Sequence, residues 1–157
     1  MMARKTTPPL LPPSAKACRP SLDTGVPIGW QRRGLIVDDN ALMLEFMQKV
    51  ARDFWVDLVA VGSCAAAKHR IAVERPFDFA ILDYRLTNGM GVEIYRDLSL
   101  YSPMTQVVFL TGYSSDELRR SVEAIGPARI ISKDAVMTPE FMGRLLTEMG
   151  VRARHQG

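Results

Sequence analysis

The sequence predicts an α/β fold in which helices cover both faces of a parallel sheet. Short, nearly continuous apolar runs alternate with segments of helical periodicity from residue 34 to residue 149. Runs of this kind are typical of strands that are buried on both sides, as in parallel sheets. In addition, acidic residues directly follow two of the runs, and functional groups of such folds gather beyond the carboxyl ends of the strands.

The strands and helices can be assigned in order from Gly34. The apolar runs predict strands at 35–37 (LIV), 56–61 (VDLVAV), 79–82 (FAIL), 107–110 (VVFL) and 128–132 (ARIIS). The segments between and after them have helical periodicity, at roughly 40–53, 63–74, 91–100, 115–125 and 138–149. Asn40, Ser63 and Thr138 are suitable N-caps, and Pro139 suits the first position of a helix. The element order is therefore βαβαβαβαβα.

The charge of the chain is divided unevenly along its length. Residues 1–33 are Pro-rich and hold six Lys and Arg against one acid, whereas residues 34–150 hold twelve against sixteen. We expect residues 1–33 to be a disordered basic extension, 34–150 to be one domain, and 151–157 to be a basic tail. Because the domain itself is mildly acidic, the composition disfavours binding to nucleic acid.

The remaining bulk features favour a cytoplasmic protein. Cys18 and Cys64 lack the spacing of a metal site, and we expect no disulfide between them. No apolar run approaches the roughly 20 residues that a membrane-spanning helix needs. The N-terminus is basic, but prolines interrupt the apolar region that a signal peptide would require.

The residues at the strand ends predict the chemistry. The first strand ends at Asp38 and Asp39, the third at Asp83, the fourth at Thr111 and the fifth at Lys133. Each residue alone has an ordinary structural explanation, such as a helix cap or a turn. Together, two or three carboxylates suit Mg²⁺, and a lysine with a hydroxyl suits a phosphoryl group. A carboxylate can itself attack phosphorus and form an aspartyl phosphate.

Four segments, LIVDDN, FAILDYRLTNGMGVEI, VVFLTGYSS and IISKD, resemble the receiver domain of two-component response regulators. The resemblance covers roughly residues 33–150. It implies a flavodoxin-like, doubly wound sheet of five parallel strands in the order 2-1-3-4-5. It also implies that Asp83 accepts a phosphoryl group from a phosphohistidine on a sensor kinase or phosphotransfer protein. Lys133 would then pair with the phosphoryl oxygens, and Thr111 would swing toward them.

The resemblance implies a magnesium site as well. Asp39 would bind Mg²⁺ directly, together with Asp83 and the backbone carbonyl of Arg85, while Asp38 would contribute through water. No other cofactor is implied. The role is that of a signalling switch that catalyses its own phosphorylation and dephosphorylation, and not that of an enzyme with an external substrate.

The sequence also departs from the usual receiver pattern. Asp134 stands where receivers usually carry proline after the lysine, and Thr87 stands where proline is frequent after the phosphoacceptor. Ile130 replaces a common Tyr or Phe, so the usual coupling between threonine and an aromatic ring is in question. Arg85 and Tyr113 occupy positions that tune dephosphorylation in receivers.

We expect a stand-alone receiver whose output is a protein contact, because only about ten residues follow the last helix. Receivers usually signal through the face formed by the fourth helix, fifth strand and fifth helix, here 115–125, 128–132 and 138–149. The downstream protein is not identified by the sequence, and a homodimer is left open. The alternative is a receiver-like interaction module that does not switch on phosphorylation. A phosphatase of the aspartyl-phosphate class is disfavoured, because Arg85 stands where its general acid would be.

Overall fold

The computed structural model describes residues 31–112, 115–135 and 138–154. The five predicted strands are present in one sheet, with small shifts of their ends. They are followed by a sixth short strand, and a hairpin of two two-residue strands lies apart from the sheet. The bounds of the strands are β1 Arg32–Val37, β2 Phe54–Val61, β3 Phe79–Asp83, β4 Arg85–Leu86, β5 Gly89–Met90, β6 Gln106–Thr111, β7 Arg129–Ser132 and β8 Arg152–Ala153.

All five predicted helices are present, and the predicted caps are confirmed. The side chains of Asn40, Ser63 and Thr138 each accept a backbone N–H from the first turn of the helix that follows, and Pro139 begins the last helix. A short 3₁₀ helix, Lys133–Ala135, follows β7. The α-helices are α2 Ala41–Ala51, α3 Cys64–Glu74, α4 Gly91–Tyr101, α5 Asp116–Glu123 and α6 Pro139–Glu148.

The main sheet has the order β7-β6-β3-β1-β2-β8. Its first five members run parallel, and they correspond to the predicted order 2-1-3-4-5 read from the opposite edge. The predicted flavodoxin-like fold is therefore confirmed. The addition is β8, which pairs antiparallel with β2 and so covers the edge that β2 would otherwise leave open.

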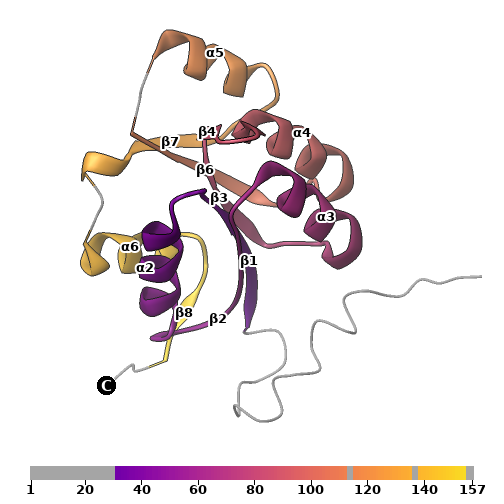
Figure 1. Cartoon of the computed structure of the whole chain (residues 1–157). Helices are drawn as coiled ribbons and strands as arrows, with labels where there is room; N and C mark the ends of the chain where they lie inside the picture. The colour runs from indigo at the N-terminus through magenta and orange to yellow at the C-terminus, as the bar shows by residue number, and fades with distance from the viewer. Residues whose placement is uncertain (1–30, 113–114, 136–137, 155–157) are drawn as a thin grey trace, which may run out of the picture.

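The two faces of the sheet hold separate hydrophobic cores (Figure 1). Helices α3, α4 and α5 pack on one face, around residues such as Leu35, Leu82 and Phe109. Helices α2 and α6 pack on the other face, around Ile36 and Ile81. Neighbouring residues of β1 and β3 thus enter opposite cores, as the alternation of side chains along a strand requires.

The first strand begins three residues earlier than the sequence pattern indicates. Arg32 and Arg33, which were assigned to the N-terminal extension, lie in β1. The guanidinium of Arg33 forms ion pairs with Asp57 and Glu74 and lies over the ring of Phe77. These contacts hold the start of β1 against β2 and α3. Residues 1–30 lie outside the described residues, so the predicted disorder there stays a prediction.

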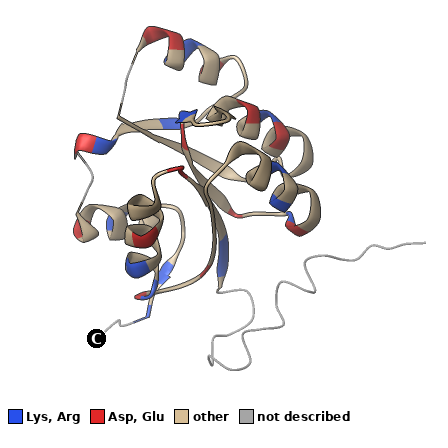
Figure 2. Ribbon diagram, viewed as in Figure 1, with Lys and Arg blue, Asp and Glu red and all other residues tan. Residues whose placement is uncertain are grey.

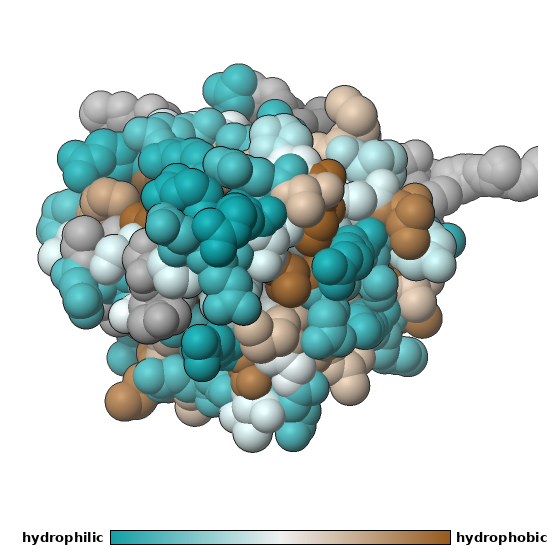
Figure 3. Space-filling model, turned by 90° about the horizontal axis from the view of Figure 1, so that it is seen from above, coloured by the Kyte–Doolittle hydropathy of each residue, from teal (hydrophilic) through white to brown (hydrophobic). Residues whose placement is uncertain are grey.

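Charged residues occur along the helices and at the strand ends (Figure 2). Seen from above, the molecule presents a mainly hydrophilic surface with scattered apolar residues (Figure 3). Within the described ranges, no helix is long and apolar enough to span a bilayer. Cys64 is a buried free thiol, and Cys18 lies outside the described residues.

Candidate functional site

The register of the parallel strands brings the predicted site residues to one edge of the sheet. Val37 lies opposite Leu82, so Asp38 and Asp83 follow at neighbouring strand ends. Because Asp83 lies opposite Leu110, Thr111 is one residue further along β6. Thr111 in turn lies opposite Ser132, directly before Lys133.

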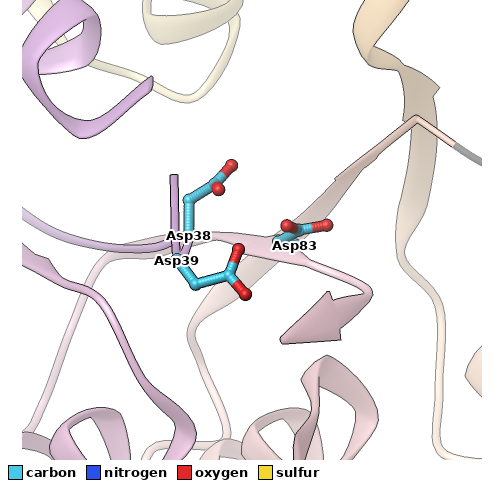
Figure 4. A group of neighbouring side chains, drawn as sticks. All are labelled: Asp38, Asp39 and Asp83. Carbon is cyan, nitrogen blue, oxygen red and sulfur yellow. The ribbon is translucent and has the colours of Figure 1, made fainter. Parts of the chain in front are cut away.

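Three carboxylates form an acidic cluster at this edge (Figure 4). One carboxylate oxygen from each of Asp38, Asp39 and Asp83 lies within 4.8 Å of the others. Asp38 and Asp83 are buried, with 2% and 8% of their surface exposed, whereas Asp39 is exposed. Isolated carboxylates so deeply buried would be costly, so the cluster needs positive charge close by.

Lys133 supplies that charge from the end of β7. Its Nζ lies 2.7 Å from Oδ2 of Asp38 and 3.2 Å from Oδ2 of Asp83, and its side chain is only 20% exposed. The second oxygen of Asp38, Oδ1, accepts the backbone N–H of Asn40 at 2.9 Å. Both oxygens of Asp38 are therefore engaged, by a helix cap residue on one side and by the lysine on the other.

The electrostatics of the two buried groups follow from this arrangement. Burial raises the pKa of Asp83, and the charges of Asp38 and Asp39 raise it further, while Lys133 opposes the rise. Burial lowers the pKa of Lys133, but its hydrogen bond with Asp38 and the charges of Asp38 and Asp83 outweigh burial, so the net shift is upward. The pKa of Asp83 is thus raised chiefly by burial, and that of Lys133 is raised by its two carboxylate partners.

The donor set fits a hard divalent cation. Three carboxylates and one ammonium give a formal charge of −2, which a dication would neutralise. Oxygen ligands that leave part of the coordination sphere to water are those that Mg²⁺ prefers. The acidic cluster is thus of the kind that binds Mg²⁺ in receiver domains.

The comparison with known families agrees with this reading. Residues 35–141, about two thirds of the chain, match the model of the response regulator receiver domain. The chain belongs to the response regulator receiver domain family. A receiver domain receives its phosphoryl group from a histidine kinase system, and it is not a turnover enzyme.

Individual relatives and a solved structure agree with this family assignment. The chain is 35% identical over 101 residues to the DNA-binding transcriptional activator DevR/DosR of Mycobacterium tuberculosis, covering 63% of this chain and 46% of that protein. It is 32% identical over 108 residues to the photosynthetic apparatus regulatory protein RegA of Cereibacter sphaeroides, covering 69% of this chain and 58% of that protein. The structure of the chemotaxis response regulator CheY4 of Vibrio cholerae shares the fold, with a TM-score of 0.66, 21% identity, and coverage of 76% and 98%.

This receiver domain spans about half the length of the two curated relatives just described. The expectation of a stand-alone receiver is therefore not tested by them and stays a prediction.

The other predicted site residues lie at different depths around the acidic cluster, and one of them is outside the described residues. Thr111 is buried, with 3% of its surface exposed. Ile130 lies in β7 opposite Phe109 and packs against the core that α3, α4 and α5 cover. Arg85 is exposed in β4, two residues after the phosphoacceptor position. Tyr113 lies outside the described residues. Asp134 is exposed, and its backbone N–H donates to Oγ of Ser132.

One contact of the receiver site was not foreseen from the sequence. The hydroxyl of Thr87 donates to Oδ2 of Asp39 at 2.5 Å, although the two residues are 48 positions apart. The sequence marked Thr87 only as a replacement for proline. The sequence signal that could have indicated this contact is a hydroxyl residue four positions after Asp83. A tight turn at that point can bring the hydroxyl back to the site.

Proposed function

We propose that this receiver domain accepts a phosphoryl group on Asp83 and signals through a protein contact. The observation that supports the proposal most directly is the convergence of three carboxylates and Lys133 at the carboxyl edge of β1, β3 and β7. Asp83 is the member of the cluster at the end of the central strand β3, with neighbours on both sides. Asp83 is therefore the carboxylate that both the other two acids and Lys133 can reach.

In this mechanism an Oδ atom of Asp83 attacks phosphorus as the bond from phosphorus to the histidine nitrogen breaks. The nitrogen leaves with the bonding electrons, and the imidazole takes up a proton from solvent. Lys133 already lies 3.2 Å from Asp83, so its ammonium can follow the negative charge onto the phosphoryl oxygens. Mg²⁺, when bound, supplies charge neutralisation for the transferring group.

The metal ligands in the proposal are those that the family resemblance implies. Asp39, Asp83 and the backbone carbonyl of Arg85 would hold Mg²⁺ directly, and Asp38 would act through water. The contacts of Asp38 support its indirect role, because Asn40 and Lys133 already engage both of its oxygens. The exposure of Asp39 supports its direct role, because a hydrated ion can reach it.

The readout of the phosphoryl group involves further residues in the proposal. Thr111 donates its hydroxyl to a phosphoryl oxygen, and Arg85 and Tyr113 tune the approach of water. The face formed by α5, β7 and α6 contacts the downstream protein. On this face Arg119 and Arg120 are exposed, whereas Arg129 forms an ion pair with Glu148 at 2.7 Å.

The proposed phosphodonor is a sensor histidine kinase or a histidine phosphotransfer protein, and the proposed location is the cytoplasm. A second candidate function is a receiver-like interaction module that does not switch. Ile130 favours it, because an aliphatic side chain packed against the core cannot perform the rotamer change of an aromatic ring.

Intact-protein mass after incubation with a small-molecule phosphodonor and Mg²⁺ tests the site. We expect one acid-labile phosphoryl group on the wild type and none on Asp83→Asn, which keeps the shape but removes the nucleophile. Asp97→Asn, on α4, is the matched control and should be phosphorylated like the wild type. An equal adduct on Asp83→Asn would show that the assignment of the acceptor is wrong.

Amide hydrogen exchange then separates the two candidate functions. A switch predicts that protection over α5 and β7 changes when the wild type is phosphorylated. Phosphorylation without any such change would favour the non-switching module. Failure of the folded wild type to accept phosphate from either a small donor or a cognate phosphohistidine would favour it more strongly.

A further inference from the structure

Thr87 connects the turn after the phosphoacceptor strand to the acidic cluster. It lies between β4 and β5, and its Oγ1 donates to Oδ2 of Asp39 at 2.5 Å. Both side chains belong to exposed residues. A hydrogen bond to an ionised carboxylate is of the stronger kind, and at this length it fixes the orientation of the acceptor.

The turn that carries Thr87 is itself held in place. The backbone N–H of Gly91 donates to the carbonyl of Tyr84 at 2.7 Å, and the N–H of Met90 donates to Oε2 of Glu93 at 3.1 Å. Glu93 also forms an ion pair with Lys68 of α3 at 3.2 Å. Thr87 therefore lies in a hairpin whose position is held by hydrogen bonds to α4 and, through Glu93, by an ion pair with α3.

Asp39 is the member of the cluster that needs this support. Asp38 is fixed by Asn40 and Lys133, and Asp83 is fixed by burial and by Lys133. Asp39 is exposed, and its side chain would lose rotamer freedom on binding a cation unless it were already ordered. A donor to Oδ2 orders the group beforehand and leaves Oδ1 for a cation.

We propose that Thr87 is a positioning residue of the metal centre, whose hydroxyl holds Asp39 in the orientation in which it and Asp83 bind one cation directly. This inference rests on the proposed function, because it needs the cluster to bind Mg²⁺. A proline, which is frequent at this position in receivers, would have no such donor. Outer hydrogen bonds of this kind orient metal ligands and contribute substantially to metal affinity.

Calorimetric titration of the full chain with Mg²⁺ alone tests the inference. We expect Thr87→Val, which keeps the side-chain shape but lacks the hydroxyl, to weaken Mg²⁺ binding by about tenfold. Thr87→Ala should give the same loss without the added methyl group, and Thr87→Ser should restore affinity close to that of the wild type. Urea unfolding without Mg²⁺ should be nearly unchanged in all three variants, because the residue is exposed.

The matched control is Thr147→Val on α6. Its hydroxyl donates to the carbonyl of Gly143 within the same helix, so Mg²⁺ affinity should not change. Wild-type affinity in Thr87→Val and Thr87→Ala would overturn the inference and leave the proposed function intact. Tighter binding in these variants would also overturn it, because the hydroxyl would then compete with the cation. A wild type that does not bind Mg²⁺ would refute the metal site of the proposed function, and the inference with it.

Discussion

Gly91 is the position at which a single methyl group should disturb both the packing and the chemistry. It is the first residue of α4, and the helix begins directly against the backbone of β3. A Cβ atom added to Gly91 would lie 2.2 Å from the carbonyl oxygen of Asp83 and 3.0 Å from Cε1 of Phe109. Gly91→Ala therefore places a clash on the backbone of the proposed phosphoacceptor.

The size of the effect follows from the distance. Cβ atoms essentially never approach another atom closer than 3.0 Å, so the strand and the helix must separate by at least 0.8 Å, the difference from 2.2 Å. The strand cannot yield easily, because β3 is bonded to β1 on one side and to β6 on the other. Overpacking of this kind costs about 1–3 kcal/mol of stability. A displacement near 1 Å at a reacting group can slow a reaction by about 10²-fold.

Urea unfolding followed by circular dichroism and the rate of phosphoryl adduct formation together measure both consequences. Gly112→Ala is the control, because a Cβ at Gly112 would meet no atom within 4 Å among the residues that the structure describes. It should keep or slightly raise the stability of the wild type, since alanine restricts the unfolded chain. If Gly91→Ala were as stable and as rapidly phosphorylated as Gly112→Ala, the close packing of α4 on the Asp83 backbone would be refuted.

Three further predictions concern charged groups. Lys133→Ala removes the cation between two buried carboxylates, so without Mg²⁺ the unfolding free energy of the variant should fall by as much as about 3 kcal/mol. Added Mg²⁺ should stabilise the variant more than it stabilises the wild type. An equal loss of stability with and without Mg²⁺ would contradict this prediction. The hydrogen bond from Lys68 lowers the pKa of Glu93, so Glu93→Gln should cost stability at neutral pH, and the difference should vanish as pH falls through that lowered pKa. Because the pair is partly exposed, the loss should stay below about 1 kcal/mol, and urea unfolding at neutral and acidic pH measures it. Arg154→Ala removes a guanidinium 4.1 Å from the ring centroid of Trp55, and should lower the unfolding free energy by about 1 kcal/mol, whereas Arg119→Ala, at an exposed position of α5, serves as the control.

The sequence was sufficient for the sheet and for most of the site because both depend on simple geometry. Each strand of a parallel sheet covered on both faces must be apolar along its length, so the five runs were visible without any knowledge of contacts. The carboxyl ends of neighbouring parallel strands meet at one edge, which is why Asp38, Asp83 and Lys133 could be grouped from their positions alone. In the structure these three side chains lie together.

The parts that could not be predicted depend on short segments and on contacts between distant residues. Strand β8 has two residues, too few to show a period, and it exists because it pairs with the edge of β2. Arg154 reinforces that pairing by donating to the carbonyl of Phe54 at 3.0 Å while its guanidinium covers Trp55. The bond from Thr87 to Asp39 depends on the path of a tight turn, which residue types alone do not determine.

In the proposed function, the charge of the pocket gives a receiver with Ile130 a way to respond to phosphorylation. With a bound dication the three carboxylates and Lys133 are formally neutral, and replacing the Asp83 carboxylate by a dianionic phosphoryl group adds one negative charge. The group nearest to that charge is the ammonium of Lys133, which directly follows β7. In the proposed function the hydroxyl of Thr111, the last residue of β6, is the second such group. Because an isoleucine has no ring to rotate, we infer that the response in the proposed function is a displacement of these paired strand ends. β7 is linked to α6 by the exposed ion pair between Arg129, at the start of the strand, and Glu148 at 2.7 Å, so the displacement would pass along β7 before it reached α6.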